Sequence, residues 1–126
     1  MKNILKITLV SLLILLVVLV FNSKNTSIEL SLENNSGETT TDFFLYLANS
    51  TTPQSIPNIE PNDTYVTTIK YDKSQDEDSL RLFYHDYNGE KNDIILIDSF
   101  KKGYIKKLKI DIIDIDENGV YTLEIL

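Results

Sequence analysis

The chain has no cysteine and no tryptophan, and only one histidine and one methionine among its 126 residues. Without cysteine it can form no disulfide, no thiolate nucleophile, no redox pair and no cysteine-ligated zinc site. Lipid attachment through an N-terminal cysteine is excluded for the same reason. His85 alone cannot build a metal centre of several histidines.

Positive charge is also scarce. The chain has 12 Lys and Arg residues against 19 Asp and Glu residues, which gives a net charge of −7 and a pI near 4.6. Nucleic-acid phosphates are bound by basic surfaces, so this composition argues against a nucleic-acid partner. The length of 126 residues predicts one folded domain.

The N-terminal segment lacks charge over a long run. From Ile7 to Phe21 no residue is charged, and Lys2 and Lys6 precede the run. A basic segment before a short apolar stretch is typical of an export signal. Residues 4–21 are just long enough to span a bilayer if Lys6 reaches towards the interface. No small-x-small cleavage site follows, so we expect residues 1–23 to form an uncleaved signal anchor, one hydrophobic transmembrane helix.

The lysines also predict the orientation. Lys2 and Lys6 lie before the apolar run and only Lys24 closely follows it, so the positive-inside rule places the N-terminus in the cytoplasm. We therefore expect a single-pass cell-membrane protein with an extracytoplasmic C-terminal domain, or a secreted protein if the signal is cleaved. A buried helix of a soluble protein is less favoured, because such helices usually carry a polar stripe.

Beyond a short linker at residues 24–27, the pattern is that of strands. Apolar and polar residues alternate at 28–33, and no later stretch keeps a helical period. A loop is expected at 49–55, and two prolines restrict 56–63 to an edge segment and a turn. Further strands are expected at 42–48, 64–71, 80–87, 90–97, 104–115 and 120–126. Residues 28–126 thus predict an all-β fold, a single antiparallel immunoglobulin-like β-sandwich of about seven strands.

Two Asn-Gly pairs, at residues 88–89 and 118–119, predict hairpin turns. Glycine supplies the positive φ that tight hairpins require. The strand before the second turn is ambiguous, because apolar residues up to Ile112 share one face whereas Ile113 and Ile115 share the other. A bulge near 112–114, or a loop longer than two residues, would reconcile the two patterns.

The second turn also resembles half of a calcium loop. In an EF-hand, Asp114, Asp116 and Asn118 would supply oxygen ligands at positions 1, 3 and 5, before a glycine at position 6. The bidentate glutamate should then fall at position 125, which is Ile125, and the flanks are patterned as strands rather than helices. The hairpin turn is therefore the favoured interpretation, with a non-EF calcium site as the alternative. No other metal and no cofactor is predicted.

Two further charged clusters have simple interpretations. The acidic residues at 76–78, together with Asp72, are expected to form a solvated loop, or alternatively a metal or basic-partner contact. They can cooperate with the acidic 114–119 turn only if both lie at the same end of the sandwich. Five lysines predict the polar face of an exposed strand, with an acidic partner or a wall polyanion as the alternative. They are Lys101, Lys102, Lys106, Lys107 and Lys109.

Catalytic signatures are missing. His85 beside Asp86 is the one place to seek a general base, but no nucleophile motif such as G-x-S-x-G accompanies the pair. We predict a structural or surface histidine, no catalytic residue and no enzyme activity. Tyrosine is frequent, with seven residues in the chain, and is expected mainly in strands and core, although it is also favoured at interfaces.

Three turn-containing stretches, at residues 32–37, 59–64 and 100–104, carry a resemblance. They read Leu-Glu-Asn-Asn-Ser-Gly, Ile-Glu-Pro-Asn-Asp-Thr and Phe-Lys-Lys-Gly-Tyr. With the N-terminal segment, the layout is similar to small exported proteins of low-GC Gram-positive bacteria that have a signal anchor followed by one β-sandwich. The resemblance implies that location and fold; it assigns no activity, and no residue takes a role from it.

The expected function is that of a non-catalytic, membrane-anchored extracytoplasmic binding module that recognises another protein through loops or an exposed strand edge. The alternative is a binder of carbohydrate or cell-wall polymer, assisted by calcium in one version, and a small hydrolase is a remote third. Aromatic residues in one concave row would favour carbohydrate, whereas a flat apolar patch or a free edge strand would favour protein.

Overall fold

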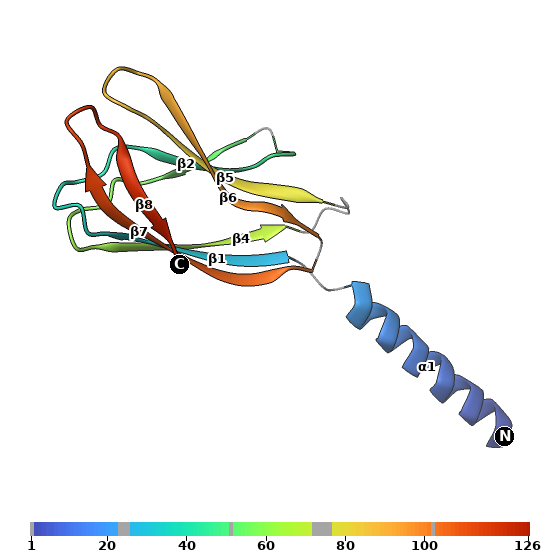
Figure 1. The fold of residues 1–126 in the computed structure, drawn as a ribbon. Helices are drawn as coiled ribbons and strands as arrows, with labels where there is room; N and C mark the ends of the chain where they lie inside the picture. Colours follow the sequence, from blue (N-terminus) through green and yellow to red (C-terminus); the bar gives the residue numbers. More distant parts are fainter. Residues whose placement is uncertain (1, 23–25, 51, 72–76, 102) are drawn as a thin grey trace.

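The computed structural model of the chain describes all residues except 1, 23–25, 51, 72–76 and 102. Within these described residues one helix, α1 (Lys2–Asn22), precedes eight strands (Figure 1). The strands are β1 (Thr26–Asn34), β2 (Phe43–Leu47), β3 (Gln54–Ile56), β4 (Thr64–Tyr71), β5 (Asp78–His85), β6 (Lys91–Phe100), β7 (Ile105–Ile115) and β8 (Tyr121–Ile125). The first strand begins two residues earlier than expected, so Thr26 and Ser27 belong to β1 and not to a linker.

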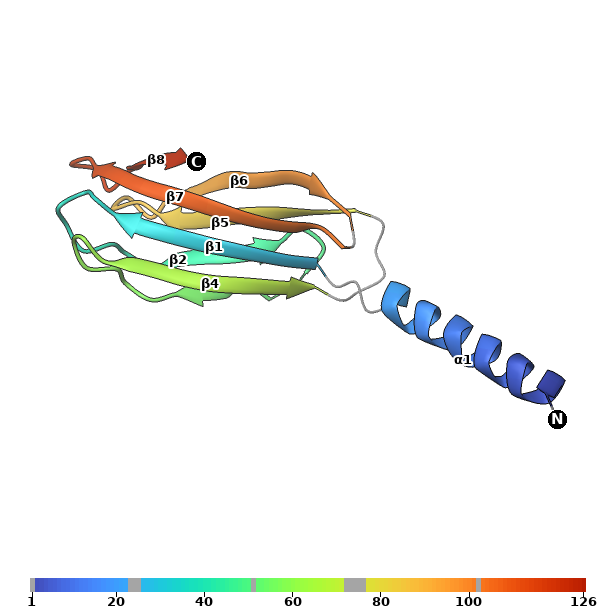
Figure 2. The same cartoon turned by 90° about the horizontal axis from the view of Figure 1, so that it is seen from below.

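The strands form two four-stranded sheets packed face to face, which confirms a β-sandwich (Figures 1 and 2). Sheet A has the order β4-β1-β7-β8, and sheet B has the order β3-β2-β5-β6. The prediction of a wholly antiparallel fold is wrong at one pair, because β1 and β7 are parallel. The turn after β6 lies where β1 begins: the Ser27 N–H donates to the Tyr104 carbonyl at 2.9 Å. Strand β7 therefore starts beside the start of β1 and runs in the same direction.

The eighth strand is the short β3, which lies partly in the segment 49–55 that was expected to be a loop. Its three residues pair with β2 at the edge of sheet B. Pro53 and Pro57 flank it, and because proline cannot donate a ladder hydrogen bond they keep the strand short. The expected strand at 64–71 coincides with β4.

The core lies between the sheets and follows from the alternation seen in the sequence. Along β1 the side chains of Ile28, Leu30 and Leu32 are fully buried, and the residues between them are half-buried. They face the inner side of sheet B, where Phe43 packs edge-on against Tyr84, with ring centroids 5.5 Å apart. The buried side chains of both sheets form one hydrophobic cluster.

The predicted bulge in the last hairpin is confirmed. The β7–β8 register shifts between Ile112 and Asp114, so that one extra residue, Ile113, is inserted. Ile112 is fully buried and Ile113 is 42% exposed, whereas Ile115 again packs against the core. Because of the extra residue, the side chains that point into the core are Ile110 and Ile112 before the bulge and Ile115 after it, which resolves the conflict between the two apolar patterns.

Both Asn-Gly pairs form hairpin turns, and the two turns are built alike. The N–H of Asp86 donates to the carbonyl of Glu90 at 2.9 Å, and the N–H of Gly89 donates to the Asp86 carbonyl at 3.0 Å. Residues 116–120 repeat this pattern. Only the glycines, both with φ 78°, take a positive φ in these turns. Each turn is therefore a three-residue loop with a glycine bulge, and not a two-residue turn.

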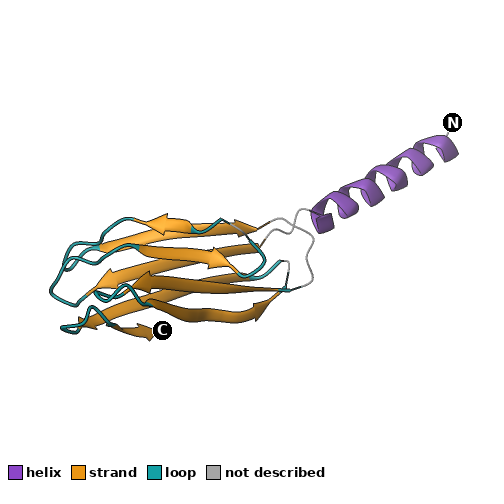
Figure 3. Cartoon of the chain, turned by 90° about the horizontal axis from the view of Figure 1, so that it is seen from above, coloured by secondary structure: helices purple, strands orange, loops and turns teal. Residues whose placement is uncertain are grey.

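The two ends of the sandwich carry different segments. The near end, where β1 begins, also holds the end of β4, the start of β5 and the turn between β6 and β7 (Figure 2). The far end holds both Asn-Gly turns and the loops 35–42 and 57–63. Helix α1 lies outside the sandwich, beyond the near end (Figure 3). Within the described part of the chain, no helix has the length and apolar character needed to cross a membrane.

Candidate functional site

The outer face of sheet A is polar. The alternating residues that point away from the core on β1 are Ser27, Glu29, Ser31 and Glu33, each half-buried. They pair in register with Lys107, Lys109 and Asp111 on β7 and with Thr64, Val66, Thr68 and Lys70 on β4. Val66 and Ile105, which pairs with Ser27 on β7, are the apolar members of these rows, and both are exposed. This face has the composition of ordinary solvated protein surface.

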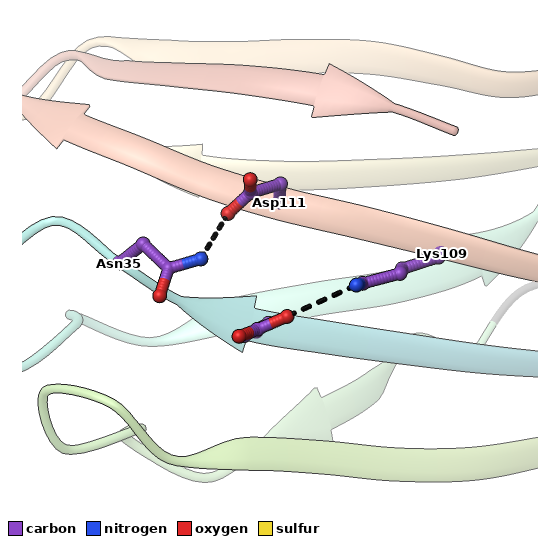
Figure 4. Close-up of polar contacts among 4 residues, drawn as sticks. Asn35, Lys109 and Asp111 are labelled. Carbon is purple, nitrogen blue, oxygen red and sulfur yellow. Dashed lines mark hydrogen bonds and ion pairs between the residues drawn. The ribbon is translucent and has the colours of Figure 1, made fainter.

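Two lysines of the predicted stripe, Lys107 and Lys109, lie on this face beside acidic side chains. Lys107 and Lys109 are exposed, as expected, and Lys109 Nζ lies 3.1 Å from Glu33 Oε2 (Figure 4). Beside this ion pair, Asn35 Nδ2 donates to Asp111 Oδ1 at 2.6 Å. Lys106 is exposed on β7 and Lys101 in the turn before it, whereas Lys102 lies outside the described residues. A stripe bordered by acids in this way offers little net positive charge to a polyanion.

The outer face of sheet B is different, because aromatic residues occupy its centre. On β2 and β5 the residues between the buried Phe43, Leu45 and Leu82 point outward. The register sets Phe44 beside Phe83 and Tyr46 beside Arg81. We call this surface the aromatic face; its members are Phe44, Tyr46, Arg81, Phe83, His85, Lys91, Asp93 and Ile95.

Phe83 is the centre of the aromatic face. Its ring stacks on that of Phe44, with centroids 4.9 Å apart and planes 16° apart, and Tyr46 meets it edge-on at 5.6 Å. The ammonium group of Lys91 lies 4.3 Å from the Phe83 ring centroid, within the range of a cation–π interaction. All three aromatic side chains are half-buried by one another and remain open to solvent on one side.

Charged groups border the aromatic rings. The Tyr46 hydroxyl donates to Asp93 Oδ2 at 2.6 Å. This hydrogen bond and partial burial raise the pKa of Tyr46, because loss of its proton would place two negative charges together. Arg81, Lys91 and Asp93 thus surround a fixed aromatic group with both signs of charge. Such a surface can bind by apolar contact at its centre and by directed polar contacts at its rim.

His85 lies at the edge of the aromatic face and is exposed. Its ring meets Phe83 edge-on at 5.9 Å, and it borders a hollow with Thr41, Asp42 and Phe44. Asp86 does not orient it through Oδ1, which accepts the backbone N–H groups of Asn88 and Glu90 at 2.9 and 3.0 Å. The carboxylate therefore serves the turn, and among the described contacts His85 is positioned by an aromatic ring.

The candidate calcium residues lie in the second turn. Asp116 Oδ1 accepts the backbone N–H groups of Asn118 and Val120, at 2.8 and 2.9 Å. Asp114 lies before the turn, in the β7–β8 ladder opposite Thr122. Across the described residues, no three His, Asp or Glu side chains converge as the ligands of a metal ion would. The alternative of a calcium site at Asp114, Asp116 and Asn118 stays a prediction.

The described residues of the other acidic cluster, Glu77 and Asp78, lie at the start of β5, at the opposite end of the sandwich from the 114–119 turn, so they do not meet that turn. Asp72 and Asp76 fall outside the described residues. The expectation that residues 76–78 are solvated is wrong for Asp78, which is 5% exposed. Its Oδ1 accepts the N–H groups of Asn49 and Ser79 at 3.1 and 2.8 Å and so fastens the turn after β2 to the start of β5.

The aromatic face was not predicted from the sequence. The sequence predicts a strand at 42–48 without indicating which strand pairs with it, and the signal that could have revealed the face is the pair of outward positions, Phe44 and Phe83. Their contact depends on the β2–β5 register, which links residues far apart in the chain. Comparison with protein-family models, curated proteins and solved structures finds no match to the chain.

Proposed function

We propose that this chain is a non-catalytic binding module of the immunoglobulin-like kind, and that it recognises another protein through the aromatic face of sheet B. The observation that carries the proposal is the open cluster of Phe44, Tyr46 and Phe83 bordered by Arg81 and Lys91. Aromatic residues and arginine are enriched where proteins bind one another, and a few such residues supply most of the binding energy.

The contrast between the two sheets supports this choice of surface. The outer face of sheet A is mostly Ser, Thr, Glu and Lys, with single apolar residues such as Val66 and Ile105 among them, and its Lys109 is ion-paired with Glu33. On the outer face of sheet B, by contrast, the three aromatic rings of Phe44, Tyr46 and Phe83 are only half-buried, at positions where a solvated sheet surface usually carries polar residues. Burying the solvent side of these rings against a partner would remove apolar area from water, which contributes about 25 cal/mol per Å².

A second candidate ligand is a carbohydrate or cell-wall polymer. The half-open aromatic rings of this face favour it, because an aromatic ring can pack against the apolar side of a sugar ring. Asp93 beside the rings could accept hydrogen bonds from sugar hydroxyls in addition to that of Tyr46. A small hydrolase, the third option, would need a nucleophile positioned by His85, and the contacts of His85 described above include none.

We also propose that residues 4–21 anchor the module in the cell membrane, with the sandwich outside the cell. The proposal is supported by the uncharged run 7–21 and by the exposure of the apolar side chains of α1, such as Ile4 at 70% and Leu13 at 64%. Lys2 and Lys6 before the run favour a cytoplasmic N-terminus. Intact mass of the membrane fraction tests it: a soluble species that begins near residue 24 would rule out the anchor.

The partner is sought by cross-linking the tagged full-length chain in its own cells and identifying the captured molecules by mass spectrometry. The variant Phe83→Ala should lose the partner, and Ile113→Ala, an exposed apolar residue on sheet A, should keep it. One dominant protein that is lost only with Phe83→Ala supports protein recognition. Wall polymer lost with the same variant moves the assignment to the carbohydrate alternative. Equal capture by both variants rejects the aromatic face.

A further inference from the structure

The sheets have four edges, and they differ in how they are protected from pairing with another strand. Strand β3 has three residues between two prolines, β8 has five residues, and β6 contains a register shift and the charges of Lys91, Asp93 and Asp98. Strand β4 has eight residues, pairs with β1 without a shift, and carries Lys70 as its single charge. Short, bulged or charged edges resist pairing, so β4 is the least protected of the four.

The free side of β4 can be assigned to particular residues. The N–H of Asn34 donates to the carbonyl of Asp63 at 2.9 Å, so the even-numbered residues of β1 bond towards β4. Hydrogen-bonded and non-bonded pairs alternate along an antiparallel ladder, so residues 65, 67, 69 and 71 bond towards β1. The N–H and C=O groups that point away from the sheet therefore belong to Thr64, Val66, Thr68 and Lys70.

This edge is complementary to itself. Two β4 strands can be paired antiparallel with Thr67 of one copy opposite Thr67 of the other. In this register Thr64 lies opposite Lys70 and Val66 lies opposite Thr68, so every outward backbone group is paired. No like charges meet. Glu33 lies beside Thr64 on β1, so Lys70 of a second copy would reach the row that holds Glu33.

The side chains of β4 that face inward fit the same arrangement. Ile69 borders one hollow at the open side of the sandwich, with Leu45, Leu47 and Leu80, and Tyr65 borders another with Ile59. In the pairing about Thr67, Tyr65 of one copy lies opposite Ile69 of the other. Each hollow would therefore gain an apolar neighbour from the second copy.

We propose that β4 is the docking edge for a second copy of this chain, with the two β4 strands paired antiparallel about Thr67 to form one continuous sheet. Because the strands run in opposite directions, the two α1 helices lie at opposite ends of the pair, so two copies anchored as proposed above would belong to facing membranes. The contact is one strand wide on each side, so the dimer belongs to the weak, concentration-dependent class, with a Kd on the order of 10–100 µM. The proposal is independent of the aromatic face.

Variants that change the charge at residues 64 and 70 test this register. Their dimerisation is measured by sedimentation velocity of the full-length chain in detergent. Thr64→Lys sets two lysines opposite each other, and Lys70→Glu directs an acid towards the row that holds Glu33 of the second copy. Each change should weaken dimerisation about fivefold, and the double variant should restore it. Thr122→Lys, on the opposite edge of sheet A, and Phe83→Ala, on the aromatic face, should leave the dimer unchanged. A chain that stays monomeric at millimolar concentration, or single variants without effect, overturns the proposal.

The absence of native cysteine permits a second test. The two Thr67 residues would be a directly opposed, non-hydrogen-bonded pair with Cα atoms about 4.5 Å apart, a distance that a disulfide can span. Under mild oxidation Thr67→Cys should form covalent dimers at least about tenfold faster than Thr122→Cys, since only Thr67 is held against its copy. Equal rates for the two variants contradict the pairing, whatever becomes of the aromatic face.

Discussion

The ring of Tyr87 lies against the α-carbon of Gly119, so closely that a β-carbon built there would come within 2.6 Å of Tyr87 Cδ1. The N–H of Tyr87 also donates to the Asn118 carbonyl at 2.9 Å. The hairpin turn of sheet B is thus fastened to that of sheet A at the far end of the sandwich. Gly89 holds the equivalent position in the other turn, with the same φ of 78°, but open space surrounds it.

This pair of glycines gives a matched prediction. Gly89→Ala and Gly119→Ala should both lose about 1–2 kcal/mol of unfolding free energy, because a side chain is strained at this φ. Gly119→Ala should lose about 1–3 kcal/mol more, because its β-carbon displaces Tyr87. Urea denaturation measures both. Adding Tyr87→Ala to Gly119→Ala should recover part of the extra loss, and equal losses for the two glycine variants would contradict the contact.

Some parts of this fold follow from local sequence and others do not. The alternation in β1 identifies Ile28, Leu30 and Leu32 as core residues, and the conflict between Ile112 and Ile113 indicates the bulge. Both are local patterns of period two. The β1–β7 pair is parallel because the chain crosses from β6 to β7 at the end of the sandwich where β1 begins. No local sequence pattern encodes the position of that crossing.

The candidate site could not be predicted from local sequence either, because it also depends on which strands pair. The aromatic face forms when the β2–β5 register brings Phe44 beside Phe83, and the buried Asp78 accepts the N–H of Asn49, 29 residues earlier in the chain. The sequence gives the type of each residue, and the spacing along a strand gives the face of the sheet on which the residue lies. The neighbour across the sheet is set by strand order, which is a property of the whole chain.

Asn34 is predicted to be the polar residue on which the far-end loops depend. Its side chain is fully buried, and its Nδ2 donates to the carbonyls of Glu38 and Ile59 at 2.7 and 2.8 Å. Its Oδ1 accepts from the Ser36 hydroxyl at 2.6 Å. Asn34→Ala should cost about 2–4 kcal/mol of unfolding free energy, because buried carbonyls lose their donors.

The neighbouring asparagine provides the control for that experiment. Asn35 bonds Asp111 at an exposed position, so Asn35→Ala should cost less than about 1 kcal/mol. Thermal and urea unfolding of both variants measure the difference. If the two variants were equally stable, the Asn34 side chain would not be holding the loops.

Tyr84 predicts a loss of stability at alkaline pH. Burial raises the pKa of its hydroxyl above the ordinary value of 10.0, so the folded state holds the proton more tightly than the unfolded state does. The resulting stabilisation is complete below pH 10 and is lost as the pH rises from there through the folded-state pKa. Tyr84→Phe should therefore flatten the fall in unfolding free energy above pH 10.

The same variant should be less stable at neutral pH. The Tyr84 hydroxyl accepts the buried N–H of Tyr121 at 3.0 Å, and phenylalanine leaves this donor without a partner, at a cost of about 1–3 kcal/mol. Urea titrations between pH 7 and pH 11 measure both effects. An identical pH slope for the wild type and Tyr84→Phe would show that another group controls alkaline unfolding.

Calcium is expected to have little effect on this chain. Asp116 Oδ1 already accepts two backbone N–H groups, and a cation that used this oxygen would compete with the hydrogen bonds that shape the turn. Millimolar Ca²⁺ should therefore leave the unfolding temperature unchanged, whereas a ligand that bound the folded state would raise it by linkage. A rise that Asp114→Asn abolishes and Asp86→Asn, in the other turn, retains would instead establish the calcium site. Asp116→Ala should destabilise the hairpin with or without the ion, because the N–H groups of Asn118 and Val120 lose their acceptor.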